Sequence, residues 1–582
     1  MLVRLLRRFL RPDSGLLTLL VVLQVASTVA TLYLPSLNAR IIDEGVVQGD
    51  TGFIMRTGTW MLAVSLLQVL ATIGATWIAA RSTALMAVRL RAAVFSRVGD
   101  FSAQEVARFG APTLISRATN DVLQVQQVGF MGAAMLLPAP MMMAGGVFMA
   151  LREDPGLSLL LVVAVPLLGL VVGVAISRMV PQFRSMQTSV DTVNRILREQ
   201  ITGIRVVRAF VRERTEQERF GEANTRYTNT SLAVGRLMAL TFPTVMFIVN
   251  ASTVALMWFG AKRIETGHLQ VGQLVAFLTY LMLIFMSVMM ATFMSMMIPR
   301  AAVSAGRIDE VLSTDSSVVD PEQPREIPAG PVTVALSGVD FCYPGAEHSV
   351  LHDITFTARP GETTAIIGAT GSGKTTLVNL IPRLYDVTDG AVTFNGVDLR
   401  EAALGKVWAH CGLVPQKALL FTGTIGSNLR LGRPEATDGE LWEALRIAQG
   451  EDFVRAMPDG LDSAVAQGGT NVSGGQRQRL AIARAIVARP DVYLFDDAFS
   501  ALDTATDARL RAALRPATRD ATVIVVAQRV STILEADQIV VLEAGRVVGI
   551  GTHRELLAGC ETYREIVESQ QADDQSRPEV SA

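Results

Sequence analysis

A glycine-rich stretch in the second half of the chain has the residues needed to hold a chain of phosphates. It is "GATGSGKTT", which places Gly368, Gly373, Lys374 and Thr375 in the spacing Gly-x-x-x-x-Gly-Lys-Thr after an apolar run. Glycines let consecutive backbone N–H groups surround phosphate oxygens, and the start of a helix adds a favourable dipole. Lysine supplies a compact charge for the outer phosphates, and the threonine hydroxyl faces Mg²⁺. We predict a MgATP site whose other loop members are Ala369, Thr370, Gly371, Ser372 and Thr376.

The stretch "VYLFDDAFSALD", residues 492–503, supplies carboxylates for the same site. Its apolar run is typical of a buried strand, and the strand should end at Asp496, with Asp497 following. A carboxylate at the end of such a strand is expected to hold Mg²⁺ together with Thr375. The sequence therefore predicts Asp496 as a metal-binding residue and leaves the role of the second carboxylate open.

A second stretch, "NVSGGQRQRLAIARAI", could also hold an anion. It places Ser473, Gly474, Gly475 and Gln476 at the start of an amphipathic helix, where backbone N–H groups and the helix dipole favour negative charge. This cradle has no lysine of its own, so a second surface is needed to hold a triphosphate. Two cradles about a hundred residues apart suggest that each one serves a different ATP.

The second half of the chain has the pattern of an α/β domain. Short β-branched strands alternate with helices after residue 331, which predicts a mostly parallel sheet. Residues 313–331 are rich in proline, serine and acidic residues and are interpreted as a linker. The end of the chain, 571–582, has no apolar period and is predicted to be a disordered tail.

The first half of the chain predicts six membrane-spanning helices. Each span is an apolar run of about 20 residues or more, enough to cross a hydrocarbon core of about 30 Å. The spans lie at residues 16–37, 59–80, 129–150, 157–177, 237–260 and 271–298. The first is too long for a signal peptide and lacks a small-residue cleavage site, so we expect it to remain. Residues 1–312 are thus predicted to form an α-helical transmembrane domain.

The arginine distribution predicts the orientation of these spans. Segments 81–128 and 178–236 are rich in arginine, which is retained on the cytoplasmic side, and both have helical periodicity. We therefore expect a multi-pass protein of the bacterial inner membrane with two long cytoplasmic helical loops and both termini in the cytoplasm. The net charge of −2 gives no indication of nucleic-acid binding.

Taken together, these motifs resemble a known family. Residues 332–570 are similar to the nucleotide-binding domain of ABC transporters, an α/β P-loop domain with a helical subdomain. The whole chain resembles a half-transporter of the B-type multidrug and lipid exporter family, which has the type IV fold. In that family two nucleotide-binding domains form a head-to-tail dimer, and each ATP lies between the Walker loop of one domain and the "SGGQ" of the other.

The resemblance implies roles for further residues. Tyr343 of "FCYPG" would stack on adenine, Gln416 of "VPQ" would link the magnesium site to the membrane domain, and Asp503 of "SALD" would lie at the dimer interface. The segments 108–122 and 203–213 resemble the two regions that couple the membrane domain to the nucleotide-binding domains.

The chain departs from the family pattern where water would attack ATP. Asp497 stands in place of a glutamate that orients or deprotonates the water, and Gln528 stands in place of a histidine that contacts the γ-phosphate. Aspartate is one methylene shorter, and a displacement of roughly 1 Å can cost about 10²-fold in rate. Glutamine cannot become cationic. A third departure is Gln467, which replaces a usual acidic residue. We predict a degenerate site that binds MgATP and hydrolyses it slowly or not at all.

These departures favour a heterodimer. The signature "VSGGQ" remains close to the family consensus, so it should serve an ATP held by a homologous half-transporter that supplies the active glutamate and histidine. A homodimer of this chain, with two poor sites, is the alternative.

The six spans contain no Asp, Glu, Lys or Arg, which disfavours ion coupling and favours a hydrophobic or amphipathic substrate such as a drug or lipid. The third and sixth spans are rich in methionine, which either adapts to variable ligands or packs between helices and lipid. ATP-driven export is the favoured function. Import or leaflet transfer of a lipid-like nutrient, and a nucleotide-gated regulatory subunit, are the alternatives.

Overall fold

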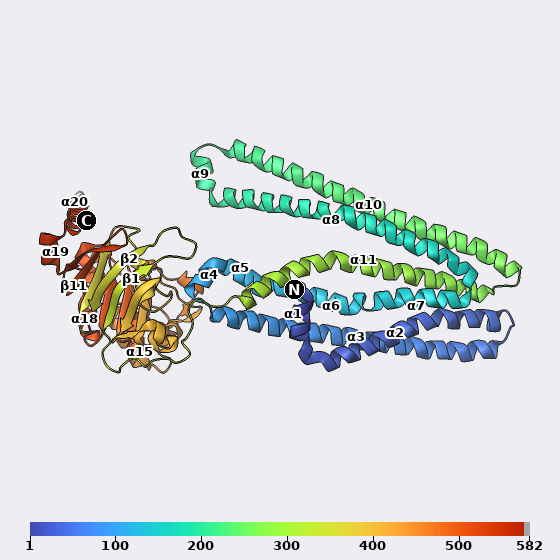
Figure 1. Ribbon diagram of the computed structural model, residues 1–582, viewed down its shortest axis with the longest axis horizontal. Helices are drawn as coiled ribbons and strands as arrows, with labels where there is room; N and C mark the ends of the chain where they lie inside the picture. The colour runs from blue at the N-terminus through green and yellow to red at the C-terminus, as the bar shows by residue number, and fades with distance from the viewer. Residues whose placement is uncertain (576–582) are drawn as a thin grey trace. The chain divides into compact units, whose positions relative to one another are not determined.

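The computed structural model describes residues 1–575, which form two compact units (Figure 1). The first unit comprises residues 1–99 and 111–314 and consists of helices. The second comprises residues 100–110 and the chain from 315 onward, and contains the sheets. A short segment that follows the second predicted span therefore belongs structurally to the second unit.

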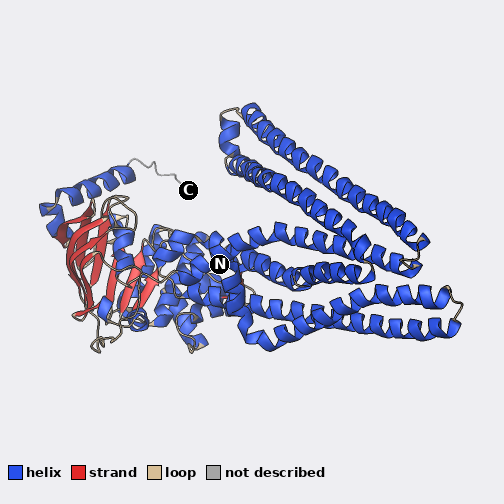
Figure 2. Ribbon diagram, turned by 45° about the vertical axis from the view of Figure 1, so that its right-hand side comes forward, coloured by secondary structure: helices blue, strands red, loops and turns tan. Residues whose placement is uncertain are grey.

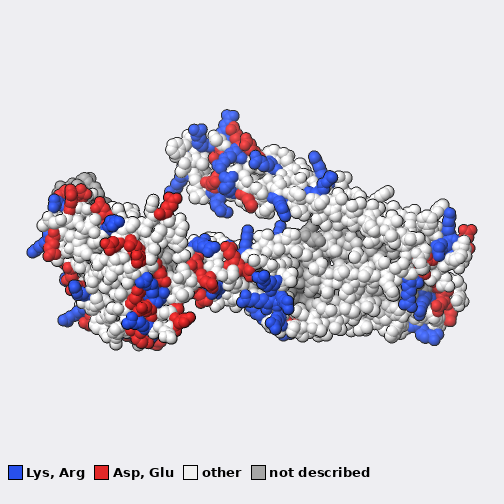
Figure 3. Space-filling view, in the orientation of Figure 1, with Lys and Arg blue, Asp and Glu red and all other residues white. Residues whose placement is uncertain are grey.

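The first unit contains six helical segments that are long and apolar enough to cross a membrane, as predicted. Its α-helices are α1 (Leu2–Leu10), α2 (Ser14–Arg40), α3 (Thr51–Gly99), α5 (Ala111–Ser116), α6 (Val122–Met131), α7 (Pro138–Glu153), α8 (Pro155–Thr202), α9 (Ile204–Ala209), α10 (Glu213–Glu265) and α11 (Val271–Ser313). Short helical turns connect some of them, namely η1 (Arg11–Asp13), η2 (Ile41–Val46), η3 (Arg117–Asp121) and η4 (Gly132–Leu136). In Figure 3 the middle of these helices is a broad uncharged zone with charged side chains toward both ends, the pattern of a multi-pass membrane protein.

Buried polar contacts fix the turns at the ends of these helices. Asp154 precedes α8, accepts a hydrogen bond from the Leu157 N–H at 2.8 Å and pairs with Arg263 of α10 at 2.9 Å. Asp43 accepts a hydrogen bond from the Gly272 N–H at 2.6 Å. A Cβ at Gly272 would lie 2.2 Å from the Ala39 carbonyl oxygen, so only glycine permits this approach.

Helices α8 and α10 form a long antiparallel hairpin that is joined by α9 (Figure 2). They contain 48 and 53 residues, and at about 1.5 Å per residue each is more than twice as long as a hydrocarbon core. Buried apolar side chains hold the hairpin to α11, among them Leu168, Val245 and Phe285. The second arginine-rich segment of the sequence is therefore a continuation of two spanning helices.

The second unit contains three sheets. A six-stranded sheet has the order β12-β11-β3-β10-β9-β6, in which only the edge strand β12 is antiparallel to its neighbour. Its strands are β3 (Thr363–Gly368), β6 (Cys411–Val414), β9 (Val492–Asp496), β10 (Thr522–Val526), β11 (Gln538–Glu543) and β12 (Arg546–Gly551). The other sheets are antiparallel and contain β1 (Val334–Phe341), β2 (Leu351–Ala358), β4 (Asp389–Phe394) and β5 (Val397–Asp398), and the pair β7 (Gly423–Thr424) and β8 (Ala464–Val465).

Strands β9 and β10 are buried at every position, as expected of parallel strands that are covered on both faces. The carboxyl ends of β3, β6, β9 and β10 lie at one edge of the sheet, because these strands run parallel. This edge brings together segments of the chain that lie more than 150 residues apart.

Helices surround the sheets of the second unit. They are α4 (Ala103–Phe109), α12 (Lys374–Leu380), α13 (Leu404–His410), α14 (Ile425–Arg430), α15 (Asp438–Ile447), α16 (Glu451–Arg455), α17 (Gly474–Ala488), α18 (Thr504–Ala517), α19 (His553–Gly559) and α20 (Glu561–Gln575), with the short turns η5 (Leu399–Glu401), η6 (Gly460–Asp462), η7 (Gln467–Gly469) and η8 (Val530–Thr532). Helix α20 extends five residues into the segment 571–582, for which the sequence predicts disorder. Its apolar residues Tyr563 and Val567 are buried and hold it to the unit, and residues 576–582 lie outside the described part of the chain.

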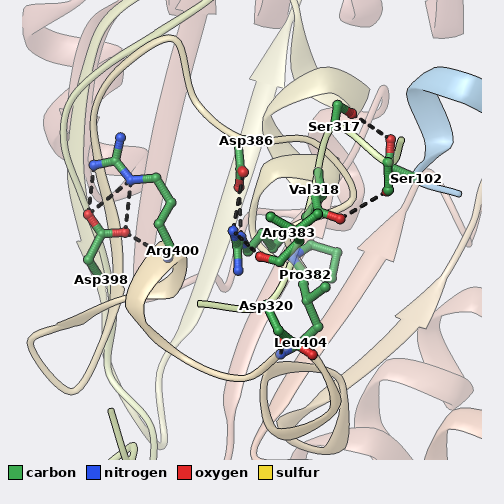
Figure 4. A network of polar contacts seen from close by, with 12 residues as sticks. Ser102, Ser317, Val318, Asp320, Pro382, Arg383, Asp386, Asp398, Arg400 and Leu404 are labelled. Carbon is green, nitrogen blue, oxygen red and sulfur yellow. Dashed lines mark hydrogen bonds and ion pairs between the residues drawn. The ribbon is translucent and has the colours of Figure 1, made fainter. Parts of the chain in front are cut away.

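Apart from Ser313, which ends α11, the predicted linker has neither helix nor strand, but it is fixed to the second unit (Figure 4). Asp320 accepts a hydrogen bond from the Leu404 N–H at 2.6 Å, and Arg383 donates one to the Val319 carbonyl at 3.1 Å. The composition of the linker indicated a lack of regular structure and gave no signal for these contacts.

Helix α4 joins the same network. Ser102 caps the helix together with Glu105, and Glu105 also accepts a hydrogen bond from the Ser317 N–H at 3.2 Å. Burial acts to raise the pKa of Glu105, but the hydrogen bonds from Ser102 and Ser317 outweigh it, so the pKa is lowered. The contacts explain why residues 100–110 group with the second unit.

Candidate nucleotide site

The predicted phosphate loop connects β3 to α12. Strand β3 ends at Gly368, and α12 begins at Lys374. Gly373 has a φ of 97°, which is in the left-handed region, and a Cβ there would lie 2.7 Å from the Leu351 side chain. The Lys374 ammonium group donates hydrogen bonds to the carbonyls of Gly368 and Ala369, each at 2.8 Å. The loop therefore has the strand–loop–helix geometry that its spacing predicts.

The pKa of Lys374 is lowered in this structure. Burial lowers the pKa of Lys374, whereas the carboxylates of Asp497 and Asp496 act to raise it. A triphosphate would add negative charge beside the ammonium group and favour its charged form further. The site is thus electrostatically suited to an anion.

Asp496 lies at the end of β9 and is buried, with 4% of its surface exposed. Its Oδ1 accepts a hydrogen bond from the Thr375 hydroxyl at 3.1 Å. Burial raises the pKa of Asp496, and the Thr375 hydrogen bond opposes that effect. A hydroxyl and a carboxylate oxygen at this separation are the hard oxygen ligands that Mg²⁺ prefers, so Thr375 and Asp496 fit the predicted metal.

Asp497 has a different environment, although it is the next residue. Its φ is 51°, in the left-handed region, and its N–H donates to the Val526 carbonyl at 3.1 Å. One carboxylate oxygen, Oδ2, accepts hydrogen bonds from the Nε2 groups of Gln416 at 3.1 Å and Gln528 at 2.8 Å. Gln416 comes two positions after the end of β6, and Gln528 comes two positions after the end of β10. Both strands are neighbours of β9, which Asp497 follows, so the three side chains meet at one edge of the sheet.

The sequence predicted that Gln416, Asp497 and Gln528 belong to one site, but not that both amides bind the same oxygen. The contact made by Gln416 in this structure is with Asp497, and its role at the metal stays a prediction. Amides can donate these hydrogen bonds but cannot take up a proton from water. The arrangement therefore holds Asp497 without supplying a second titratable group.

Tyr343 lies next to the phosphate loop. Its hydroxyl is 3.0 Å from the Thr376 hydroxyl, and its ring contacts Phe341 and Tyr385 edge-on, with centroids 4.8 and 5.6 Å away. These contacts fix the ring on which adenine is expected to stack. Tyr385 was missed by the sequence analysis, because it belongs to no recognisable motif and is placed only by the fold.

The second cradle has the predicted helix start. The Ser473 hydroxyl accepts a hydrogen bond from the Gln476 N–H at 3.2 Å, and the Gln476 side chain accepts one from the Ser473 N–H at 2.9 Å. Gly474 and Gly475 form the first turn of α17, with no side chains to cover it. Asp503 caps α18 by accepting from the Thr506 N–H at 2.9 Å, and this bonding lowers the pKa of Asp503.

Comparison with known proteins identifies the family. The family described as "ABC transporter transmembrane region" matches residues 17–288, and "ABC transporter" matches residues 351–500. A protein named as an uncharacterized ABC transporter ATP-binding protein of Mycobacterium tuberculosis is 51% identical over 575 residues, covering 98% of each chain. This chain belongs to the ABC transporter family. The resemblance of the motifs is thereby confirmed, and the ABC transporter domain implies that the protein binds ATP, usually with Mg²⁺.

Two further ABC transporters are similar to this chain over most of its length. A fatty acid ABC transporter ATP-binding/permease protein of Mycobacterium bovis is 35% identical over 446 residues, covering 76% of this chain and 70% of that protein. A bacterial Atm1-family ABC exporter solved with ATP bound has a TM-score of 0.78 at 24% identity and covers 99% of both chains. The second likeness shows that this ABC transporter has the exporter fold.

Proposed function

We propose that this ABC transporter chain is one subunit of a heterodimeric, ATP-driven exporter, and that its own Walker site binds MgATP but hydrolyses it slowly or not at all. The observation that supports this proposal most strongly is the environment of Asp497. One of its carboxylate oxygens accepts hydrogen bonds from two glutamine amides, at 2.8 and 3.1 Å.

This environment disfavours Asp497 as a catalytic base. A water that attacks ATP would have to compete with the amides of Gln416 and Gln528 for the Oδ2 atom. The shorter aspartate side chain also ends farther from the phosphate than a glutamate would, and misplacement by about 1 Å can reduce the rate roughly 100-fold. When bound, Mg²⁺ would neutralise phosphate charge beside Thr375 and Asp496, and Lys374 would orient the outer phosphates.

The second cradle supports a partner with a complete catalytic site. Ser473, Gly474, Gly475 and Gln476 form an intact helix start, which suits an ATP held by another subunit. We propose that the partner is a homologous half-transporter that supplies the glutamate and histidine missing here. Asp503 would then lie at the interface of the two nucleotide-binding domains.

A cavity among the spanning helices supports a hydrophobic substrate. It has a volume of about 210 Å³ and lies between α8, α10 and α11. Three methionines, Met179, Met238 and Met289, line it together with Phe242, and none of its lining residues is charged. Methionine adapts to ligands of variable shape. Relatives named as multidrug efflux and fatty acid transporters agree with a drug or lipid as substrate, moved out of the cytoplasm or the inner leaflet.

The orientation follows from the same proposal. The arginine-rich continuations of α3, α8 and α10 would lie in the cytoplasm with the nucleotide-binding unit and both termini. ATP binding would bring the two nucleotide-binding domains together. The segments 108–122 and 203–213, which contain α5 and α9, would transmit this movement to the spans.

The ATPase rate of the purified chain tests the proposal. It should be measured for the chain alone and after co-expression with the homologous half-transporter that is proposed as its partner. We expect ATPase activity in the pair and a rate near background for the chain alone. Brisk turnover by the lone chain would show that Asp497 is a working base and would contradict the proposal.

A further inference from the structure

We propose that Gln570, in the C-terminal helix α20, is a positioning residue that holds Gln528 beside Asp497. The Gln570 amide contacts the backbone on both sides of Arg529. Its Nε2 donates a hydrogen bond to the Gln528 carbonyl at 2.7 Å, and its Oε1 accepts one from the Val530 N–H at 2.8 Å.

The double contact restrains the segment that carries Gln528. Residues 527–529 connect the end of β10 to η8, which begins at Val530, and the backbone has left the ladder of the sheet here. Backbone groups that lose their ladder partners need other partners, and the Gln570 side chain supplies both a donor and an acceptor. Because both ends of the amide are used, a residue with only donors or only acceptors cannot reproduce the contact.

Helix α20 is anchored well enough to act as a support. Tyr563 is completely buried, and its hydroxyl is 2.8 Å from Nδ1 of His553. Val567 is also buried, and Tyr563, Val567 and Gln570 have the spacing of residues on one face of a helix. The position of Gln570 is therefore set by a packed helix, although the sequence around it, "ESQQADDQ", is polar except for Ala572.

Gln528 connects this restrained segment to the nucleotide site. Its side chain donates to Asp497 at 2.8 Å, so hydrogen bonds connect Gln570, Gln528 and Asp497 in series. The inference rests on the proposed function in one respect, namely that Gln528 lies beside the γ-phosphate of a bound ATP. The hydrogen bonds to the backbone do not depend on whether this site hydrolyses ATP.

Hydrogen exchange of the full-length chain tests the contact itself. Gln570→Ala removes the acceptor for the Val530 N–H, so we expect exchange at that amide to become about fivefold faster or more. Gln570→Glu keeps an acceptor for the Val530 N–H but loses the donor to the Gln528 carbonyl, so we expect protection of the Val530 amide between those of the unchanged chain and Gln570→Ala. The adjacent exposed Gln571, changed to Ala, is the matched control. Equal protection in Gln570→Ala and the control would overturn the inference.

A double-mutant cycle tests the connection to the nucleotide. We expect Gln570→Ala and Gln570→Glu each to reduce the preference for MgATP over MgADP by about threefold or more, because both lose the donor to Gln528. In a Gln528→Ala background, Gln570→Ala should have no further effect, since the residue through which it acts is absent. Additive effects, or an effect equal to that of Gln571→Ala, would contradict the inference.

The ATPase rate separates this inference from the proposed function. A brisk rate for the lone chain, together with a non-additive cycle, would contradict the degenerate site and leave the role of Gln570 intact. A slow rate for the lone chain together with an additive cycle would support the degenerate site and contradict the role of Gln570. Unchanged melting temperatures in the variants would show that neither result reflects unfolding.

Discussion

Asp496 and Asp497 are neighbours in the chain, yet the structure gives them opposite surroundings. Asp496 accepts a hydrogen bond from the Thr375 hydroxyl, and burial raises its pKa, so a bound cation would favour its charged form. Asp497 is already stabilised by two amides, Gln416 and Gln528. Under the proposed function, one side of this site would hold Mg²⁺ and phosphates, whereas the other side would not activate water.

The largest expected effect comes from the second cradle. In the heterodimer, Ser473→Arg should abolish transport, with a loss of about 100-fold or more, because a bulky cation would fill the space of the partner's triphosphate. Ser473→Thr keeps the helix cap and should retain most of the activity. Transport assays in vesicles that contain the pair measure both. Full activity of Ser473→Arg would show that this cradle serves no catalytic ATP.

Restoring the glutamate and histidine of the family pattern should increase ATP hydrolysis by this chain. The double change Asp497→Glu with Gln528→His should raise the ATPase rate of the chain by about tenfold or more, since it supplies a longer carboxylate and a titratable partner. Asp497→Glu alone should restore much less, because Gln528 remains. If Asp497→Glu alone gave full turnover, the loss of the histidine would have no importance.

Thr375→Val should weaken MgATP binding by about tenfold, because it removes a hydroxyl that contacts the Asp496 carboxylate and faces the predicted metal. Binding of ATP in the presence of EDTA provides the internal control and should change little. Isothermal titration measures both affinities. An equal loss with and without Mg²⁺ would show that Thr375 acts through the loop and not through the metal.

The pH dependence of Mg²⁺ binding should follow Asp496. Its pKa is raised above the ordinary value of 3.8 by burial, so Mg²⁺-dependent nucleotide affinity should begin to fall at a higher pH than an exposed aspartate would give. The same shift means that Asp496 contributes stability that is fully present below pH 3.8 and is lost as the pH rises through its folded pKa. Thr375→Val removes a hydrogen bond that lowers the pKa and should move the midpoint upward.

The smallest effect is expected for Asp497→Ala. If this carboxylate does not activate water, transport by the pair should change by less than about twofold, in contrast to Ser473→Arg. Vesicle transport under identical conditions compares the two variants. Similar large losses in both would contradict the asymmetry between the two ATP sites.

The local parts of this site could be predicted from the sequence, because they depend on residues close together in the chain. The phosphate loop, the strand that ends at Asp496 and the cap formed by Ser473 and Gln476 all follow from spacing and residue type. Six apolar runs predicted the six long helices for the same reason.

The contacts between distant segments could not be predicted in this way. Gln416, Asp497 and Gln528 meet because β6, β9 and β10 are adjacent, and strand order is not encoded in any single motif. The grouping of residues 100–110 with the second unit depends on Glu105 and Ser317, more than 200 residues apart. Gln570 directly precedes the segment 571–582, for which the sequence predicts disorder, and only the packed helix shows its contacts.

The most direct test of the central proposal is the state of the nucleotide on this chain while the pair is transporting. A photoreactive ATP labelled in the α- or the γ-phosphate can be cross-linked to each subunit during turnover. We expect this chain to retain both labels equally, because ATP stays intact at its Walker site, while the partner retains mainly the α-label. Loss of the γ-label from this chain at the rate seen on the partner would contradict a degenerate site.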